Sequence, residues 1–252
     1  MINKFLKTSD TGIFIGNIFD NADHRHYAIQ ISIALDKRIA ISSGGKNYKN
    51  TALAIKPLVA HQLKCDEQKV IVILINPASK VGHLINQHVL KKDIEPFINE
   101  WTNQIRILGS KWEKNEIDNL SFLNKYQVLT QNYFANCTDK NHESDKRILS
   151  ALDILEKHSN EILSLEYISA KVFLSPSRFI HLFKKETGIT YRRMQLWLKL
   201  MHSLDLLKQT SNLTELAYAS GFSDSAHFSR TFKETFGNKP SFFIKNSQFI
   251  QF

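Results

Sequence analysis

The chain has 252 residues, of which 42% are hydrophobic and 23% charged. This composition is typical of a folded protein and argues against intrinsic disorder, and the length is sufficient for two domains. The formal net charge of +9 favours a polyanionic partner, although a basic balance also suits contact with a membrane surface. The excess is largest from Lys146 onward, where fifteen Lys and Arg residues stand against nine Asp and Glu.

The cysteine content and the apolar segments exclude several other classes. Cys65 and Cys137 are far apart and form no Cys-x-x-Cys pair, so neither a disulfide framework nor a cysteine-based metal site is predicted. No apolar stretch has the length of a membrane span, and the first residues lack the pattern of a secretion signal. A cytoplasmic protein without a membrane anchor is therefore expected.

Between residues 13 and 75 the hydrophobic pattern has a short period that predicts β-strands. From residue 24 to 35, apolar residues such as Ile29 and Ile31 alternate with small or polar ones. Gly44-Gly45 marks a turn, and residues 70–75 form an uninterrupted apolar run that is typical of a buried strand. Several short strands separated by turns indicate a small β-barrel or sandwich.

From Lys91 the period changes to that of helices. Apolar residues recur at intervals of three and four from Ile94 to Leu108, and Gly109 is expected to end this helix. A second apolar series runs from Ile117 to Leu129. These helices could either pack on the barrel or pair two chains. The polar residues 138–145 are predicted to be a linker.

The C-terminal part contains an internal repeat. The pattern Phe-x-x-x-Phe-Lys-x-x-x-Gly begins at Phe179 and again at Phe228, an offset of 49 residues. Upstream the offset is 48, because one residue is inserted after the second turn. Each copy is predicted to form a short helix, a tight turn and a second helix.

Capping signals support both copies. In the first, Ser175 is expected to cap the second helix, Pro176 to occupy its first position and Gly188 to end it. In the second copy, Ser223 or Asp224 is the predicted cap and Gly237 the end. Gly221 can take the positive φ that such turns often need, and Ala217 is small where the two helices approach.

The two second helices each have one apolar and one polar face. Phe179 and Phe228 belong to apolar stripes, whereas the opposite faces carry the residue types that read bases in a major groove. Arg230 is the foremost candidate because arginine bonds guanine with two hydrogen bonds. The predicted DNA-binding residues are Ser177, Arg178, Ile180, His181, Lys184, Ser225, Ala226, Ser229, Arg230 and Lys233. A long helix over residues 190–209 would hold the two copies about one DNA turn, or roughly 34 Å, apart.

The motif Ser-Pro-Ser-x-Phe-x-x-x-Phe-Lys-Lys-Glu-Thr-Gly from Ser175, followed by residues 217–241, resembles the AraC/XylS family of transcription regulators. The resemblance covers residues 146–245. It implies a seven-helix DNA-binding domain, recognition helices at 176–185 and 225–236, RNA polymerase as a partner, and activation as the effect on transcription. One position departs from the family pattern: Phe173 stands where the first turn usually has a glycine or another small residue.

Residues 24–30 together with 57–61 resemble the cupin-type sensor barrel of many AraC-family proteins. Three interpretations of the histidines are open: ligands of a divalent metal, hydrogen-bonded residues inside a degenerate barrel, or the lining of a small-molecule cavity. A metal site lacks the expected carboxylate, because Gln30 stands in its place. The cavity interpretation is favoured, with neither metal nor cofactor. Its predicted effector-binding residues are His24, His26, Gln30, Ser32 and His61.

The resulting prediction is an α+β protein with three parts. Residues 1–90 form a cupin-like sensor β-barrel, 91–145 a helical connection and linker suited to dimerisation, and 146–252 an all-α domain with two helix-turn-helix motifs. The predicted function is sequence-specific binding of double-stranded DNA to regulate transcription, in response to an unknown small-molecule effector and without catalysis. The alternatives are a metal-dependent cupin-type enzyme fused to a DNA-binding domain, and an architectural protein that binds DNA constitutively.

Overall fold

The structure is a computed structural model that describes residues 3–8, 10–17, 21–65, 68–135, 145–207, 210 and 212–251. Cys137 and all of the predicted linker except Asp145 lie outside this range. The chain forms two compact units, which are described separately. The first comprises residues 1–138 and 232–252, and the second residues 139–231. No helix among the described residues is long and apolar enough to cross a membrane.

The first unit is rich in strands. Its strands are β1 (Asn3–Lys7), β2 (Thr11–Asn17), β3 (Ile29–Ala34), β4 (Ile39–Ser43), β5 (Lys46–Asn50), β6 (Ala52–Ile55), β7 (Gln62–Lys64), β8 (Lys69–Ile75), β9 (Ile94–Pro96) and β10 (Ser247–Gln251). Its helical segments are α1 (Lys80–Leu84), the π-helical turn η1 (Ile85–Val89), α2 (Glu100–Glu113) and α3 (Asn119–Ala135), followed late in the chain by α10 (Pro240–Asn246).

The strands form two sheets rather than a closed barrel. Seven strands pair in the order β10-β1-β2-β8-β3-β6-β9, and β5-β4-β7 form a separate sheet of three. All pairs are antiparallel except β1 with β10, which is parallel. The expected barrel closure is therefore wrong for the described residues. At one edge, β9 pairs only with β6 and ends at Pro96, which has no N–H to donate to a further strand.

The strand predicted over residues 24–35 is confirmed only from Ile29 to Ala34. Both faces of β3 are buried, so its polar residues Gln30 and Ser32 lie inside the unit. The buried strand predicted at 70–75 is confirmed as β8. Gly44 and Gly45 form the predicted turn between β4 and β5 with φ of +53° and +76°. These positive angles are readily adopted by glycine.

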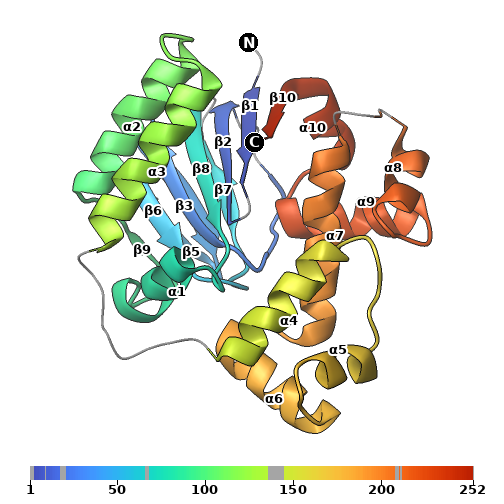
Figure 1. Ribbon diagram of the computed structural model, residues 1–252. Helices are drawn as coiled ribbons and strands as arrows, with labels where there is room; N and C mark the ends of the chain where they lie inside the picture. The colour runs from blue at the N-terminus through green and yellow to red at the C-terminus, as the bar shows by residue number, and fades with distance from the viewer. Residues whose placement is uncertain are drawn as a thin grey trace. The chain divides into compact units, whose positions relative to one another are not determined.

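Helices α2 and α3 lie side by side over one face of the large sheet (Figure 1). Trp101, Trp112 and Phe122 are fully buried there. Helix α2 begins later than predicted, because Asn99 forms a capping box with Thr102 after strand β9.

The expectation that Gly109 ends the helix is wrong, since α2 continues to Glu113. A Cβ atom at Gly109 would lie 2.3 Å from Cδ1 of Ile71 on β8. The absence of a side chain at this position therefore allows the helix to approach the sheet closely.

The second unit is helical. It contains α4 (Lys146–Lys157), α5 (Leu165–Lys171), α6 (Pro176–Thr187), α7 (Tyr191–Leu206), α8 (Leu213–Ala219) and most of α9 (Ser225–Phe236). Helices α4 to α10 provide the seven helices that the family resemblance implied. The long helix predicted between the repeats is α7, which Thr190 caps by accepting a hydrogen bond from the amide of Arg193.

Candidate nucleic-acid interface

The two predicted turns have the same backbone structure. The amide of Leu174 donates to the carbonyl of Ser169, and 48 residues later the amide of Phe222 donates to the carbonyl of Ala217, both at 2.9 Å. The residue before each donor has a positive φ, +57° at Phe173 and +79° at Gly221. The sequence repeat is therefore also a structural repeat of two helix-turn-helix motifs, α5–α6 and α8–α9.

The turns differ in how easily the chain adopts this conformation. A left-handed conformation costs a residue other than glycine roughly 1–2 kcal/mol. Phe173 bears this strain with its side chain 93% exposed, so no burial of the ring compensates for it. The departure from the family pattern at this position thus leaves the turn intact.

The caps of both second helices are those predicted. The Ser175 hydroxyl accepts a hydrogen bond from the Arg178 amide at the start of α6, and Gly188 ends the helix with φ +74°. At the start of α9, Oδ1 of Asp224 accepts from the His227 amide at 2.6 Å, which selects Asp224 over Ser223 as the cap. Gly237 follows α9 with φ +75°.

Each second helix buries two phenylalanine side chains completely. Phe179 and Phe183 on α6, and Phe228 and Phe232 on α9, have no exposed surface. The predicted DNA-binding residues lie on the remaining surface. Ser177, Arg178, Ile180, His181, Lys184, Ala226, Arg230 and Lys233 are exposed, whereas Ser225 and Ser229 are half-buried. Both helices therefore present a row of mostly polar residues opposite buried phenylalanine side chains.

Lys199 has a role that the sequence analysis missed. Its side chain is buried on α7, and Nζ donates to the carbonyl oxygen of Gly221 at 2.5 Å. Burial lowers the pKa of this ammonium group below its usual value. This contact ties the long helix to the second turn. No feature of the sequence distinguishes Lys199 from the solvent-exposed lysines nearby.

The sequence analysis also overlooked two cations at the start of α7. Arg192 and Arg193 are exposed in the first turn of this helix, whose free backbone amides favour anions. Because they do not lie on either second helix, the search for base-reading faces did not include them.

In the first unit, the five residues predicted to bind an effector form one buried cluster. The ring centroids of His24 and His61 are 4.3 Å apart, and that of His26 lies 5.1 Å from His61 and 5.7 Å from His24. Nε2 of His26 lies 2.9 Å from Oε1 of Gln30, whose Nε2 donates to Ser32 Oγ at 2.9 Å. The structure thus brings together all five residues.

The environment of this cluster keeps its imidazole rings neutral. Burial and the neighbouring histidines lower the pKa of His24 to about 4 and that of His61 to about 2. Burial also lowers the pKa of His26. At pH 7 the three rings are therefore uncharged.

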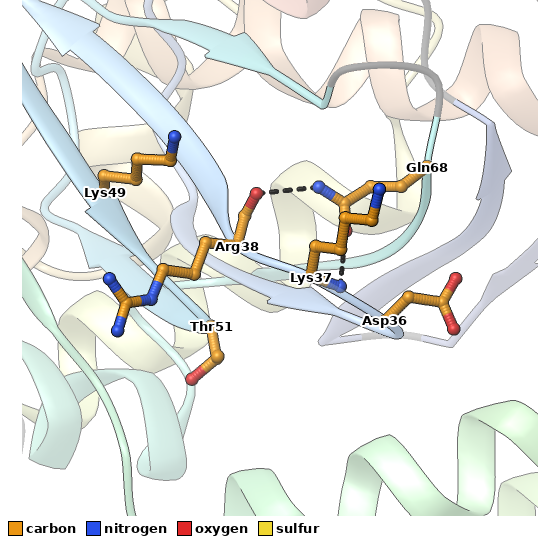
Figure 2. A pocket seen from close by; sticks show the side chains of 6 residues that line it. All are labelled: Asp36, Lys37, Arg38, Lys49, Thr51 and Gln68. Atoms are coloured by element: carbon orange, nitrogen blue, oxygen red, sulfur yellow. Dashed lines mark hydrogen bonds between the residues drawn. The ribbon is translucent and has the colours of Figure 1, made fainter.

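A second candidate ligand site in the first unit is an open hollow of about 580 Å³ (Figure 2). Gln68 holds its rim, since its Nε2 donates to the carbonyl of Arg38 at 2.7 Å and its Oε1 accepts from the amide of Lys37 at 2.9 Å. The lining residues are Asp36, Lys37, Arg38, Lys49, Thr51 and Gln68. Three cations against one carboxylate favour an anionic ligand.

The chain has two helix-turn-helix motifs joined by one long helix, and its other unit is rich in β-strands. This arrangement defines the class of double helix-turn-helix proteins with a separate N-terminal domain. Solved structures of ToxT from Vibrio cholerae share the fold. An apo ToxT variant matches with a TM-score of 0.64 and 13% identity, over 95% of this chain and 98% of that one. ToxT bound to an unsaturated fatty acid matches with a TM-score of 0.61 and 17% identity, over 95% and 96%.

Sequence comparisons find similarity to helix-turn-helix regulators in the C-terminal part of the chain. Residues 168–246 match the helix-turn-helix domain family. The transcriptional activator RhaS of Klebsiella pneumoniae is 26% identical over 62% of this chain and 54% of its own length, and RhaS of Escherichia fergusonii is 34% identical over 38% and 35%. The chain thus spans about half or less of these relatives. The regulator LumQ of Photobacterium leiognathi is 28% identical over 61% of this chain and 67% of its own. The C-terminal part of this chain is thus similar to the helix-turn-helix domains of these transcription regulators.

Proposed function

We propose that this protein binds specific sites in double-stranded DNA through α6 and α9 and thereby activates transcription. One observation carries the proposal: both helices expose a row of mostly polar residues, while Phe179, Phe183, Phe228 and Phe232 on their opposite faces are wholly buried. Ser177, Ile180 and His181 on α6, with Ala226, Ser229 and Arg230 on α9, are the proposed base-facing residues. Lys184, Lys233 and Arg178 would contact phosphates and set the register.

Genome-wide mapping of bound DNA, followed by binding to the recovered sites at fixed salt, tests this proposal. Arg230→Ala is expected to weaken specific binding by about 1–3 kcal/mol and to relax the preference at one base pair. Lys157→Ala removes the same charge from an exposed position on α4, remote in sequence from both helices, and serves as the control. Equal losses in the two variants would mean that Arg230 contributes only its charge.

Competition with unrelated DNA distinguishes a specific regulator from an architectural protein. A regulator retains its sites in excess competitor, whereas an architectural protein loses them and shows a steep dependence on salt alone. We propose no catalytic activity for this chain.

The N-terminal unit is proposed to sense an effector that changes DNA binding, which requires different affinities for two conformations. The buried cluster of His24, His26, Gln30, Ser32 and His61 is one candidate site, and the basic hollow is another. ToxT has been solved with an unsaturated fatty acid, so oleate is a suitable anionic probe for the hollow. Arg38→Ala with Lys49→Ala should abolish any effect of oleate on DNA affinity. An unchanged effect in this double variant would exclude the hollow.

We further propose RNA polymerase and a second copy of the chain as partners. Helices α2 and α3 expose Ile107, Leu120 and Val128, which supports their predicted role in dimerisation. We also propose a functional division into a sensor (1–90), a helical connection (91–145) and a DNA-binding domain (146–252). The two compact units divide the chain differently, because the end of α9 belongs to the same unit as the N-terminal sheet.

A further inference from the structure

The three buried histidines are arranged in a way that a hydrogen-bonded core does not need. Their ligand atoms lie within 4.8 Å of one another, and the side chains come from separate segments around residues 24–26 and 61. The backbone fixes two of them directly, because His24 and His61 exchange amide-to-carbonyl hydrogen bonds of 2.9 and 2.8 Å. The carbonyl of His26 accepts from the amide of Leu58 at 2.8 Å. The backbone at all three histidines is thus fixed by main-chain hydrogen bonds.

The tautomer of each ring follows from its neighbours. Nδ1 of His24, His26 and His61 lies 2.9 Å from the carbonyl oxygen of Ala22, Ala28 and Val59, respectively. A carbonyl oxygen can only accept, so each Nδ1 carries the proton and each Nε2 offers a lone pair. Histidines that bind a metal through one nitrogen typically donate the other N–H to a carbonyl or carboxylate in this way.

Two of these lone pairs face the side-chain amide of Gln30. Its Oε1 lies 2.9 Å from Nε2 of His26 and 3.2 Å from Nε2 of His61. In the tautomers just derived, Nε2 of His26, Nε2 of His61 and Oε1 of Gln30 are all acceptors, and no proton lies between them. Reversing the amide would supply donors from its NH₂ group, and a cation among the acceptors would satisfy them equally.

We propose that His24, His26 and His61 bind a divalent transition-metal ion through their Nε2 atoms, with the Gln30 amide oxygen beside it. Imidazole nitrogen is a preferred ligand of Zn²⁺, and bonds of 2.0–2.1 Å in a tetrahedral site place ligand atoms about 3.4 Å apart. The ligand atoms, which lie within 4.8 Å of one another, would draw closer on binding the metal.

The site also adjoins the end of α9 within the same unit. The amide of Ala22 donates to the carbonyl of Gly237 at 3.0 Å, and that of Arg25 donates to the carbonyl of Glu234 at 3.3 Å. A Cβ atom at Gly237 would lie 2.8 Å from Nδ1 of His24. Metal binding is therefore expected to slow amide exchange both at residues 21–26 and at residues 234–238.

Titration of the metal-free, untagged full chain with Co²⁺ and Zn²⁺ tests the inference without any DNA. One equivalent of Co²⁺ should give the visible absorption of a low-coordinate nitrogen site, and Zn²⁺ should displace it. His26→Gln and His61→Gln should each weaken binding at least about 100-fold, since even loss of an outer-shell partner costs 10–100-fold. His158→Gln, which removes a histidine from the end of α4, should leave binding unchanged.

Gln30→Glu keeps the shape of the side chain and adds a carboxylate, a common zinc ligand, so it should tighten binding about 10-fold or more. This gain would not arise from a folding defect and keeps the test decisive if a histidine variant fails to fold. Absence of stoichiometric binding by the wild type, or affinities that do not respond to Gln30→Glu, would overturn the proposal. The Gln30 amide would then be reversed and the cluster a hydrogen-bonded core. DNA binding could still stand in that case.

Discussion

Replacing Gly221 by alanine tests how the second helix-turn-helix motif is fixed within its unit. Gly221 has a φ of +79°, and a Cβ atom there would lie 2.0 Å from the carbonyl oxygen of Asn160, in the loop between α4 and α5. Gly188, after α6, has nearly the same φ of +74°, but a Cβ atom there would meet nothing within 4 Å. The two alanine variants therefore share the backbone strain and differ in the steric clash.

The expected magnitudes follow from this difference. A left-handed alanine costs roughly 1–2 kcal/mol, and the lower entropy of its unfolded chain offsets about 0.4–1 kcal/mol. Gly188→Ala should thus destabilise its unit by about 1 kcal/mol. Gly221→Ala must in addition move a backbone carbonyl, and overpacking of this kind costs typically 1–3 kcal/mol. The total for Gly221→Ala is about 2–4 kcal/mol.

Hydrogen exchange of the full chain, read out on peptides from residues 145–207 and 212–231, measures the opening free energy of the second unit alone. This avoids treating a two-unit protein as one cooperative transition. Equal losses in the two variants would refute the reasoning, because they would show that the turn does not rely on close contact with the Asn160 loop.

Two other predictions concern the same unit. Phe173→Gly should raise its stability by about 0.5–1 kcal/mol, because it removes left-handed strain and no buried surface; a loss of stability would show that the exposed ring has a stabilising contact. Lys184→Ala should weaken binding to all DNA sequences alike and reduce the slope of log K against log salt by about one, as loss of a phosphate contact does. A sequence-dependent loss would instead make Lys184 a base-reading residue.

The sequence was most informative where structure is local. Ser175, Pro176 and Gly188 set the ends of α6, and these signals act within a few residues of the chain. Gly109 was misinterpreted because its role depends on Ile71, on a strand that is distant in sequence. The barrel was expected from the strand pattern and from the resemblance of residues 24–30 and 57–61 to a cupin, and neither contains information on which strand edges pair. The residues of the histidine cluster could be predicted from the sequence. The tautomer that the three histidines share could not, because it depends on three backbone carbonyl groups whose positions are set by the fold.

The pairing of β10 with β1 has a consequence for biosynthesis. Strand β1 is translated well before β10, which follows only after both helix-turn-helix motifs have been made. Until then, the outer edge of β1 is open, and an open strand edge is a template for pairing with another chain. The nascent N-terminal sheet is therefore exposed to self-association while the residues between β1 and β10 are translated. An expressed fragment that ends after α3 should retain that edge permanently and aggregate where the longer chain does not.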